Sequence, residues 1–231
     1  MSASTRYTIL SVRHIRPYQL FALVEKSPAE RVVTAMLPAR RGAGGTSLLE
    51  TFLLIAGCKA VNACRIFEFG TFMGTNAFDL ALNTPEHAEI FTLDLPDSDV
   101  VQHHADLPLA EMHLSANAMD FTGHPVERKI RRLTGNSRQF DYSAWRNSID
   151  FVFIDGGHDA ETVKSDSDNA FALVATGRPS CIMWHDYGNH DYPELTAYLE
   201  HLSESQSIIH IEDTTLCALF SAYSTPFSVT V

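Results

Sequence analysis

One short stretch, residues 65–75, constrains the fold of this chain more than any other part of its sequence. The mostly apolar run Arg65–Phe69 is followed by two glycines, Gly70 and Gly74. This order predicts a buried strand, a tight turn and the start of a helix, because glycine lets a backbone turn sharply and pass close to another group. A second apolar run ends in Asp94. An acid at the end of a second strand can bind ribose hydroxyls, so the pattern predicts a pocket for the adenosine part of a cofactor.

The rest of the sequence alternates between apolar runs of strand length and amphipathic segments of helix length. Such alternation predicts a mostly parallel sheet with helices packed on it. The last two apolar runs, residues 207–211 and 216–221, enclose a short polar turn and predict a terminal hairpin that adds an antiparallel strand at the sheet edge. We therefore expect an α/β fold with a Rossmann-like, doubly wound sheet of seven strands.

Two parts of the chain lack this alternation. Residues 1–46 have mixed periodicity and end in a glycine-rich stretch, so we interpret them as an N-terminal lid that binds substrate. The catalytic domain is expected to occupy residues 47–231. Residues 95–125 are irregular and contain four histidines whose spacing matches no standard zinc pattern. We expect a second covering segment there, because long loops in compact domains often form lids.

The composition excludes several classes of partner. The 28 acidic residues outnumber the 17 Lys and Arg residues, and the net charge of −11 disfavours a nucleic-acid partner. No stretch approaches the ~20 apolar residues of a membrane span. The first residues lack the apolar core of a signal peptide, and the four cysteines form no C-x-x-C pair. We therefore expect a cytoplasmic protein with no nucleic-acid or membrane partner, and the sequence leaves open whether it forms a homo-oligomer.

Polar residues follow the apolar runs at the places where strands are expected to end. In an open parallel sheet, ligands bind outside the carboxyl ends of the strands. Folding alone does not require an acid at each of these ends. The segments concerned are Glu68–Gly70, Asp94, Gly135–Ser137, Asp155–His158 and His185–Asp186. Their recurrence predicts one extended site along this edge of the sheet.

Structural roles compete with functional ones at several of these acids and histidines. Glu50 has the capping-box spacing from Ser47, and we favour that role over contact with a cofactor. The carboxylate of Asp159 is expected to interact favourably with the positive, N-terminal end of the dipole of the following helix. His158 could either cap this helix or act as a base, and Asp186 could be a turn residue.

Taken together, these segments resemble the signature motifs of class I S-adenosylmethionine-dependent methyltransferases. The resemblance is carried by Glu68-Phe-Gly-Thr-Phe-Met-Gly74, by Asp94 and by Asp150-Phe-Val-Phe-Ile-Asp-Gly-Gly-His158. The segments Ile154–His158 and Trp184–Tyr187 are most similar to small-molecule O-methyltransferases of the macrocin type, and more distantly to the catechol type.

The resemblance implies that S-adenosylmethionine is the cofactor. It implies that the methionine end lies against Glu68, Gly70, Thr71 and Gly74, the ribose against Asp94, and the adenine against Asn136 and Ser137, with Asp155 also lining the pocket. A dinucleotide is the competing ligand, as in an NAD(P)-dependent oxidoreductase. Its fingerprint has a glycine between the outer two, where this chain has Phe72 and Met73, so a cofactor without a pyrophosphate fits better.

The resemblance also implies the chemistry of the other half of the site. Asp155 and Asp186 would end neighbouring strands, and paired carboxylates suit Mg²⁺, with His185 as a further metal ligand. His158 would be the general base that takes a proton from the hydroxyl of a small-molecule acceptor, with Asp155 beside it in the catalytic centre. We therefore expect O-methylation of a small hydroxylated molecule. A non-catalytic member of the fold is the other alternative, because His185 and Tyr187 stand where relatives carry ligands.

Overall fold

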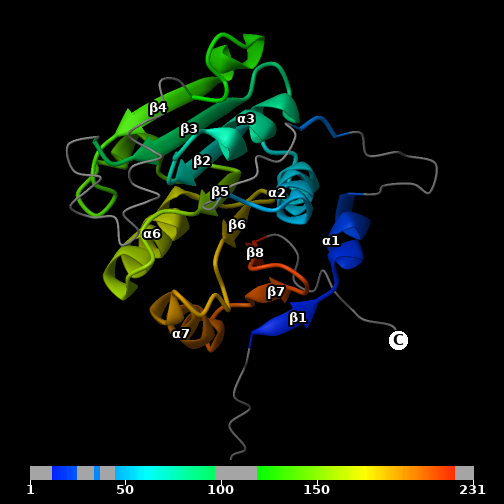
Figure 1. Ribbon diagram of the computed structural model, residues 1–231, viewed down its shortest axis with the longest axis vertical. Helices are drawn as coiled ribbons and strands as arrows, with labels where there is room; N and C mark the ends of the chain where they lie inside the picture. The colour runs from blue at the N-terminus through cyan, green and yellow to red at the C-terminus, as the bar shows by residue number, and fades with distance from the viewer. Residues whose placement is uncertain (1–11, 25–33, 37–44, 97–118, 222–231) are drawn as a thin grey trace, which may run out of the picture.

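An eight-stranded sheet forms the centre of the protein, as Figure 1 shows for the computed structural model. The structure describes residues 12–24, 34–36, 45–96 and 119–221. The strands are β1 (Arg13–Ile15), β2 (Arg65–Phe69), β3 (Glu89–Asp94), β4 (Ile130–Thr134), β5 (Phe151–Ile154), β6 (Cys181–Trp184), β7 (Ile209–Ile211) and β8 (Cys217–Phe220). Their order across the sheet is β1-β7-β8-β6-β5-β2-β3-β4.

The expected fold class is confirmed, with two corrections to the sheet. Strand β8 is antiparallel to both β6 and β7, whereas β1–β7, β2–β3, β2–β5, β3–β4 and β5–β6 are parallel pairs. The antiparallel strand therefore lies inside the sheet and not at its edge. The predicted number of seven strands is also wrong, because Arg13–Ile15 pairs with β7 as an eighth strand. Three residues with two exposed side chains are too short to give a visible alternation.

Helices cover both faces of the sheet (Figure 1). The helical segments are α1 (Pro17–Val24), α2 (Leu48–Ala60), α3 (Thr75–Leu82), α6 (Ala160–Leu173) and α7 (Pro193–Ser203), with 3₁₀ turns η1 (Pro125–Lys129) and η2 (Ser143–Trp145). Successive residues of β5 face opposite cores, as the period of a strand requires. Phe151 and Phe153 pack with residues of α2 and α3, whereas Val152 and Ile154 pack with residues of α6 and α7.

The register of the parallel strands aligns their carboxyl ends at one edge of the sheet. Phe69 pairs with Ile154, and Ile154 pairs with Trp184. The residues that follow these strands, including Gly70, Asp155 and His185, must therefore emerge side by side. The same alternation that buries the strands thus collects the polar strand ends into one place.

Large parts of the two expected covering segments lie outside the described residues. Residues 97–118 and most of residues 1–46 belong to this part, so their roles as lids stay predictions. Within the ranges that the structure describes, no helix is both long and apolar enough to cross a bilayer.

Candidate active site

The two glycines after β2 are required by contacts within the protein. Gly70 has φ +93°, and a Cβ at this position would lie 2.2 Å from the backbone oxygen of Asp155. Gly74 has φ +79°, and a Cβ there would lie 2.6 Å from the ring of Phe121. Residues other than glycine rarely adopt this left-handed backbone conformation. The glycines therefore let β2 and β5 end against each other and let the segment after residue 119 pack onto the turn.

Asp94 braces this turn from the end of β3. Its Oδ2 accepts hydrogen bonds from the backbone N–H groups of Thr71 (3.1 Å) and Phe72 (2.8 Å), and its Oδ1 accepts one from Leu95. Phe72 has φ +47°, which is unfavourable for a residue with a side chain. The hydrogen bonds of Asp94 offset that cost. The carboxylate that is expected to bind the ribose therefore also fixes the conformation of the turn.

Glu68 is a buried acid beneath the same turn. Its Oε2 accepts a 2.5 Å hydrogen bond from the hydroxyl of Thr92, which also contacts the hydroxyl of Thr71. No partner among the described residues reaches Glu68 Oε1. Burial raises the pKa of Glu68 to about 8, and the negative charges of Asp155 and Asp94 act in the same direction. The turn therefore covers a carboxyl group with one unused acceptor.

The second half of the site is centred on His185, which follows β6. Its Nδ1 lies 3.0 Å from Asp155 Oδ1 and 3.3 Å from Asp186 Oδ2, and its Nε2 lies 3.5 Å from Glu50 Oε2. Burial by itself lowers the pKa of His185, but the attraction of the three carboxylates outweighs it and holds the pKa far above its usual range. The raised pKa favours the imidazolium form of His185, whose Nδ1 lies close to Asp155 and Asp186, whereas Nε2 is near Glu50 without a hydrogen bond.

Glu50 joins the N-terminus of α2 to this cluster. The predicted capping box is confirmed, since Ser47 N–H donates to Glu50 Oε2 and Glu50 N–H donates to the Ser47 hydroxyl. The backbone N–H and hydroxyl of Thr215 both donate to Glu50 Oε1 at 2.9 Å. Burial raises the pKa of Glu50, but bonds from His185, Thr215 and Ser47 reverse this effect and place the pKa well below its usual range.

His158 is held in place by Asp186 and by an aromatic ring. Its Nε2 lies 2.9 Å from Asp186 Oδ2, and its ring stacks on Tyr192 with centroids 3.8 Å apart and planes 8° apart. Because the carboxylate accepts from Nε2–H, the neutral tautomer leaves Nδ1 as a proton acceptor. The cap of α6 is Asp159, whose side chain accepts from Thr162 N–H, so the capping alternative for His158 is wrong.

Asp186, which contacts both His158 and His185, has an unusual backbone conformation. Its φ is +65°, a region that Asp tolerates better than most residues. The side chain of Asn189 donates to Asp186 Oδ1, while Oδ2 faces both histidines. Burial raises the pKa of Asp186, but the hydrogen bonds to His158 and His185 outweigh this effect and hold the pKa well below its usual range.

One atom from each of Asp155, His185 and Asp186 lies within 4.8 Å of the other two, as expected for a small cation site. Two carboxylates and an imidazole can bind a divalent ion, with the imidazole favouring a softer one than Mg²⁺. The same distances also fit hydrogen bonds from a protonated His185. A metal would have to displace that proton, because imidazole binds metals in its neutral form.

The expected adenine-binding residues follow β4. Asn136 Oδ1 accepts from Arg138 N–H, and the carbonyl oxygen of Ser137 accepts from the hydroxyl of Tyr142. Both groups therefore stabilise their own turn. The sequence did not indicate Tyr192 or Thr215 as parts of the site, because neither belongs to a motif and both reach it only through the fold.

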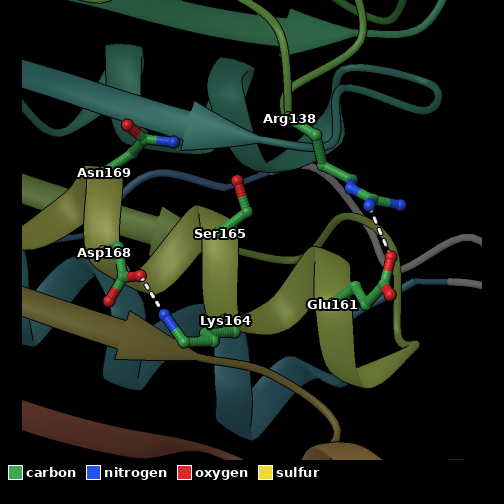
Figure 2. A pocket seen from close by; sticks show the side chains of 6 residues that line it. All are labelled: Arg138, Glu161, Lys164, Ser165, Asp168 and Asn169. Atoms are coloured by element: carbon green, nitrogen blue, oxygen red, sulfur yellow. Dashed lines mark hydrogen bonds and ion pairs between the residues drawn. The ribbon is translucent and has the colours of Figure 1, made fainter.

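An open groove lies beside this turn, on the outer side of α6. Figure 2 shows that its charged groups point toward one another. Arg138 pairs with Glu161 at 2.5 Å, and Lys164 pairs with Asp168 at 2.5 Å. None of the strand-end acids or histidines lines this groove, so it is not the centre of the site.

A family model described as a methyltransferase domain matches residues 67–187. The chain belongs to this family. The match runs from β2 to Tyr187 and so includes every strand-end segment of the site. The resemblance to class I S-adenosylmethionine-dependent methyltransferases is thereby confirmed. No curated protein sequence matches the chain.

Solved structures share the fold of this methyltransferase at low sequence identity. Podospora anserina PaMTH1, a methyltransferase bound to S-adenosylhomocysteine, is 16% identical with a TM-score of 0.54 over 77% of this chain and 79% of that one. The O-methyltransferase TomG of Streptomyces achromogenes, in complex with S-adenosylmethionine, is 16% identical with a TM-score of 0.54 over 77% and 82%. A Bacillus cereus O-methyltransferase with S-adenosylhomocysteine is 15% identical with a TM-score of 0.52 over 78% and 84%.

The close approach at Gly70 gives a stability prediction for this methyltransferase. We expect Gly70→Ala to reduce the free energy of unfolding by at least about 3 kcal/mol, because the new Cβ meets a backbone oxygen as well as an unfavourable φ. Gly177→Ala is the control, since Gly177 has φ +80° but nothing within 4 Å. Urea denaturation should show a loss of only about 1 kcal/mol there. Equal losses in the two variants would contradict the steric argument.

The buried carboxyl of Glu68 predicts a pH dependence of stability. With the pKa raised from 4.5 to about 8, the folded state holds a proton that the unfolded state has lost, so stability falls as the pH rises through this range. We expect Glu68→Gln to be more stable than wild type at pH 8, by on the order of 1–3 kcal/mol, and the difference to shrink toward pH 5. Denaturation at both pH values measures this, with the exposed Glu200→Gln as control. A constant difference would argue against a raised pKa.

Proposed function

We propose that this protein transfers the methyl group of S-adenosylmethionine to a hydroxyl oxygen of a small molecule. The observation that carries the proposal is the position of the His158–Asp186 pair beside the braced glycine turn. Asp155 lies between these two halves, because its carbonyl meets Gly70 and its carboxylate meets His185. A cofactor on the turn and an acceptor at His158 would therefore meet at the end of β5.

The cofactor side of the proposed site offers acceptors where S-adenosylmethionine has donors. Glu68 Oε1 is buried and has no partner among the described residues, and the carboxylate of Asp94 lies at the same turn. Phe72 and Met73 fill the turn where a dinucleotide needs a glycine. These features favour S-adenosylmethionine over a nicotinamide cofactor. When bound, its sulfonium supplies an electrophilic methyl group and a neutral thioether leaving group.

On the acceptor side, His158 is proposed as the general base. Asp186 orients the imidazole through Nε2, and the stack on Tyr192 fixes the plane of the ring. Nδ1 would take the proton of the acceptor hydroxyl as the oxygen forms its bond to the methyl carbon and the carbon–sulfur bond breaks. The imidazolium that results is stabilised by the carboxylate of Asp186.

We also propose that Asp155, Asp186 and His185 can hold a divalent cation. Their donor set fits a small ion, and a metal bound there would lower the pKa of the acceptor hydroxyl and orient its oxygen. Mg²⁺ is the first ion to test because two of the three ligands are carboxylates.

Cofactor choice is tested by calorimetry on the full chain. We expect S-adenosylhomocysteine to bind in the micromolar range and NADH not to bind, because Phe72 and Met73 stand where the dinucleotide fingerprint has a glycine. Repeating the titration with Mg²⁺ and an acceptor mixture shows whether the cation acts with the acceptor. Binding of NADH in place of S-adenosylhomocysteine would favour the oxidoreductase alternative.

The base is tested by His158→Ala. We expect kcat to fall by about 10²–10⁴-fold, the usual contribution of general base catalysis, with little change in the affinity for S-adenosylhomocysteine. Release of S-adenosylhomocysteine in the presence of phenols, catechols and sugars measures turnover. His190→Ala is the matched control, since His190 is exposed and lies in the loop after β6, a few residues from Asp186. Full turnover by His158→Ala would remove His158 from the mechanism, and no turnover by wild type on any acceptor would favour the non-catalytic alternative.

A further inference from the structure

Two histidines face each other on neighbouring strands at the β1 edge of the sheet, and the proposed reaction uses neither. His14 of β1 and His210 of β7 are register partners in this parallel pair. Their Nδ1 atoms lie 2.9 Å apart, and their rings are nearly perpendicular, at 89°. The alternating residues Ile15, Ile209 and Ile211 pack on the opposite face, in the core that α1 and α2 share. The fold therefore brings two imidazole nitrogens together outside the core.

A backbone carbonyl fixes which nitrogen of His210 carries the proton. Nε2 of His210 lies 2.9 Å from the carbonyl oxygen of Thr214, which can only accept, so Nε2 donates. In the neutral ring, Nδ1 then keeps a lone pair, and this nitrogen faces His14. Burial, helped by the charge of His14, lowers the pKa of His210, which favours the neutral ring. Histidines that bind metals are held in the same way, with the other ring N–H donated to a carbonyl.

The separation of the two Nδ1 atoms suits a metal ion. Bonds of about 2.0–2.1 Å from a metal to imidazole nitrogens place two ligands roughly 2.9 Å apart when they meet at a right angle. The observed 2.9 Å is therefore already the spacing of two ligands of one ion. His14 is exposed, so its ring can turn until both lone pairs face that ion. Without a metal the two nitrogens share a hydrogen bond, and a metal would displace its proton.

The residues around the pair add little charge of their own. Glu212 follows His210 by two residues and so lies on the same face of the chain, but Arg16 lies 3.6 Å from its carboxylate. In the ranges that the structure describes, no third His, Cys or acid completes a compact cluster with the pair. Water would therefore fill the remaining positions of the ion. Two imidazole ligands at a right angle favour Ni²⁺, Cu²⁺ or Zn²⁺ over Mg²⁺, which prefers oxygen.

We propose that His14 and His210 bind a divalent transition-metal ion through their Nδ1 atoms, and that this ion joins β1 to β7. The site is separate from the cluster at the ends of β5 and β6, which offers two carboxylates and one imidazole. Strand β1 leads into α1, which packs against α2 (Figure 1). The N-terminus of α2 carries Glu50 of the candidate active site. The ion would thus hold the first described strand and helix beside that site.

The test is calorimetry with NiCl₂ on the full chain without a histidine tag. We expect wild type to bind Ni²⁺ in the micromolar range. His14→Gln should bind it at least about tenfold more weakly, because even the loss of an outer partner of a metal ligand costs about 10–100-fold. Gln can still donate an N–H to His210 Nδ1, so the variant keeps the pairing and loses a metal ligand. His201→Gln is the matched control, since His201 is exposed on α7 beside Glu204.

The same comparison separates this site from the other candidate cation site. Equal Ni²⁺ affinity in wild type and His14→Gln would place the ion elsewhere, for example at Asp155, His185 and Asp186, and overturn the proposal. No Ni²⁺ binding by wild type would also overturn it.

A second measurement needs no variant. Bound Ni²⁺ should slow tryptic cleavage after Arg13, the residue before His14, because a ligand that binds only the folded arrangement stabilises it. A peptide substrate in the same solution controls for the activity of trypsin. Cleavage at an unchanged rate would show that the ion does not hold β1 on the sheet.

Discussion

The positive charge of His185 is the interaction on which the rest of the site depends. Three acids from three parts of the chain, Glu50, Asp155 and Asp186, converge on its imidazole ring. Carboxylates that converge in a buried place repel one another, and each costs several kcal/mol to desolvate. The imidazolium offsets these costs only because all three acids contact it. The N-terminus of α2 and the ends of β5 and β6 are therefore held together by one shared charge.

The balance of this cluster is still negative. Three carboxylates against one imidazolium leave a deficit of positive charge that neighbouring backbone donors, such as those of Thr215 on Glu50, reduce but do not remove. An extra cation is therefore favoured near Asp155 and Asp186. A divalent metal is one such cation, and a ligand with a sulfonium group at the end of β5 is another. The position of the cluster next to the glycine turn means that either charge would be stabilised by the same acids.

Much of this arrangement could be predicted from local patterns, and the exceptions have physical reasons. The periodicity of the apolar residues predicts the strand ends, and the spacing from Ser47 predicts the capping box of Glu50. Because parallel strands end at the same edge of a sheet, the sequence also predicts that Asp94, Asp155 and Asp186 lie along that edge. The alternation could not reveal β1, whose three residues are too few. It also could not place β8 between β6 and β7, because strand order depends on packing between distant segments.

Contacts between side chains were the least predictable part of the site. The glycine spacing suggested close approach to a ligand. In the structure, the space left by the missing Cβ of Gly70 is used by the carbonyl of Asp155, and that of Gly74 by the ring of Phe121. The stack of Tyr192 on His158 joins residues from different elements. No spacing rule connects such residues, since their proximity exists only once the sheet and its helices have formed.

The acids of the site differ in whether the protein itself satisfies them. Glu50 and Asp186, on the acceptor side, have partners, and those partners hold their pKa values well below the usual range. Glu68, on the proposed cofactor side, has one oxygen without a partner among the described residues, and burial raises its pKa to about 8. An unsatisfied buried acceptor reduces the stability of the fold, so folding alone does not account for this one. A ligand that donates hydrogen bonds would remove that cost on binding. The proposed cofactor side would therefore favour a ligand that donates hydrogen bonds, whereas Asp186 on the other side is already occupied in orienting His158.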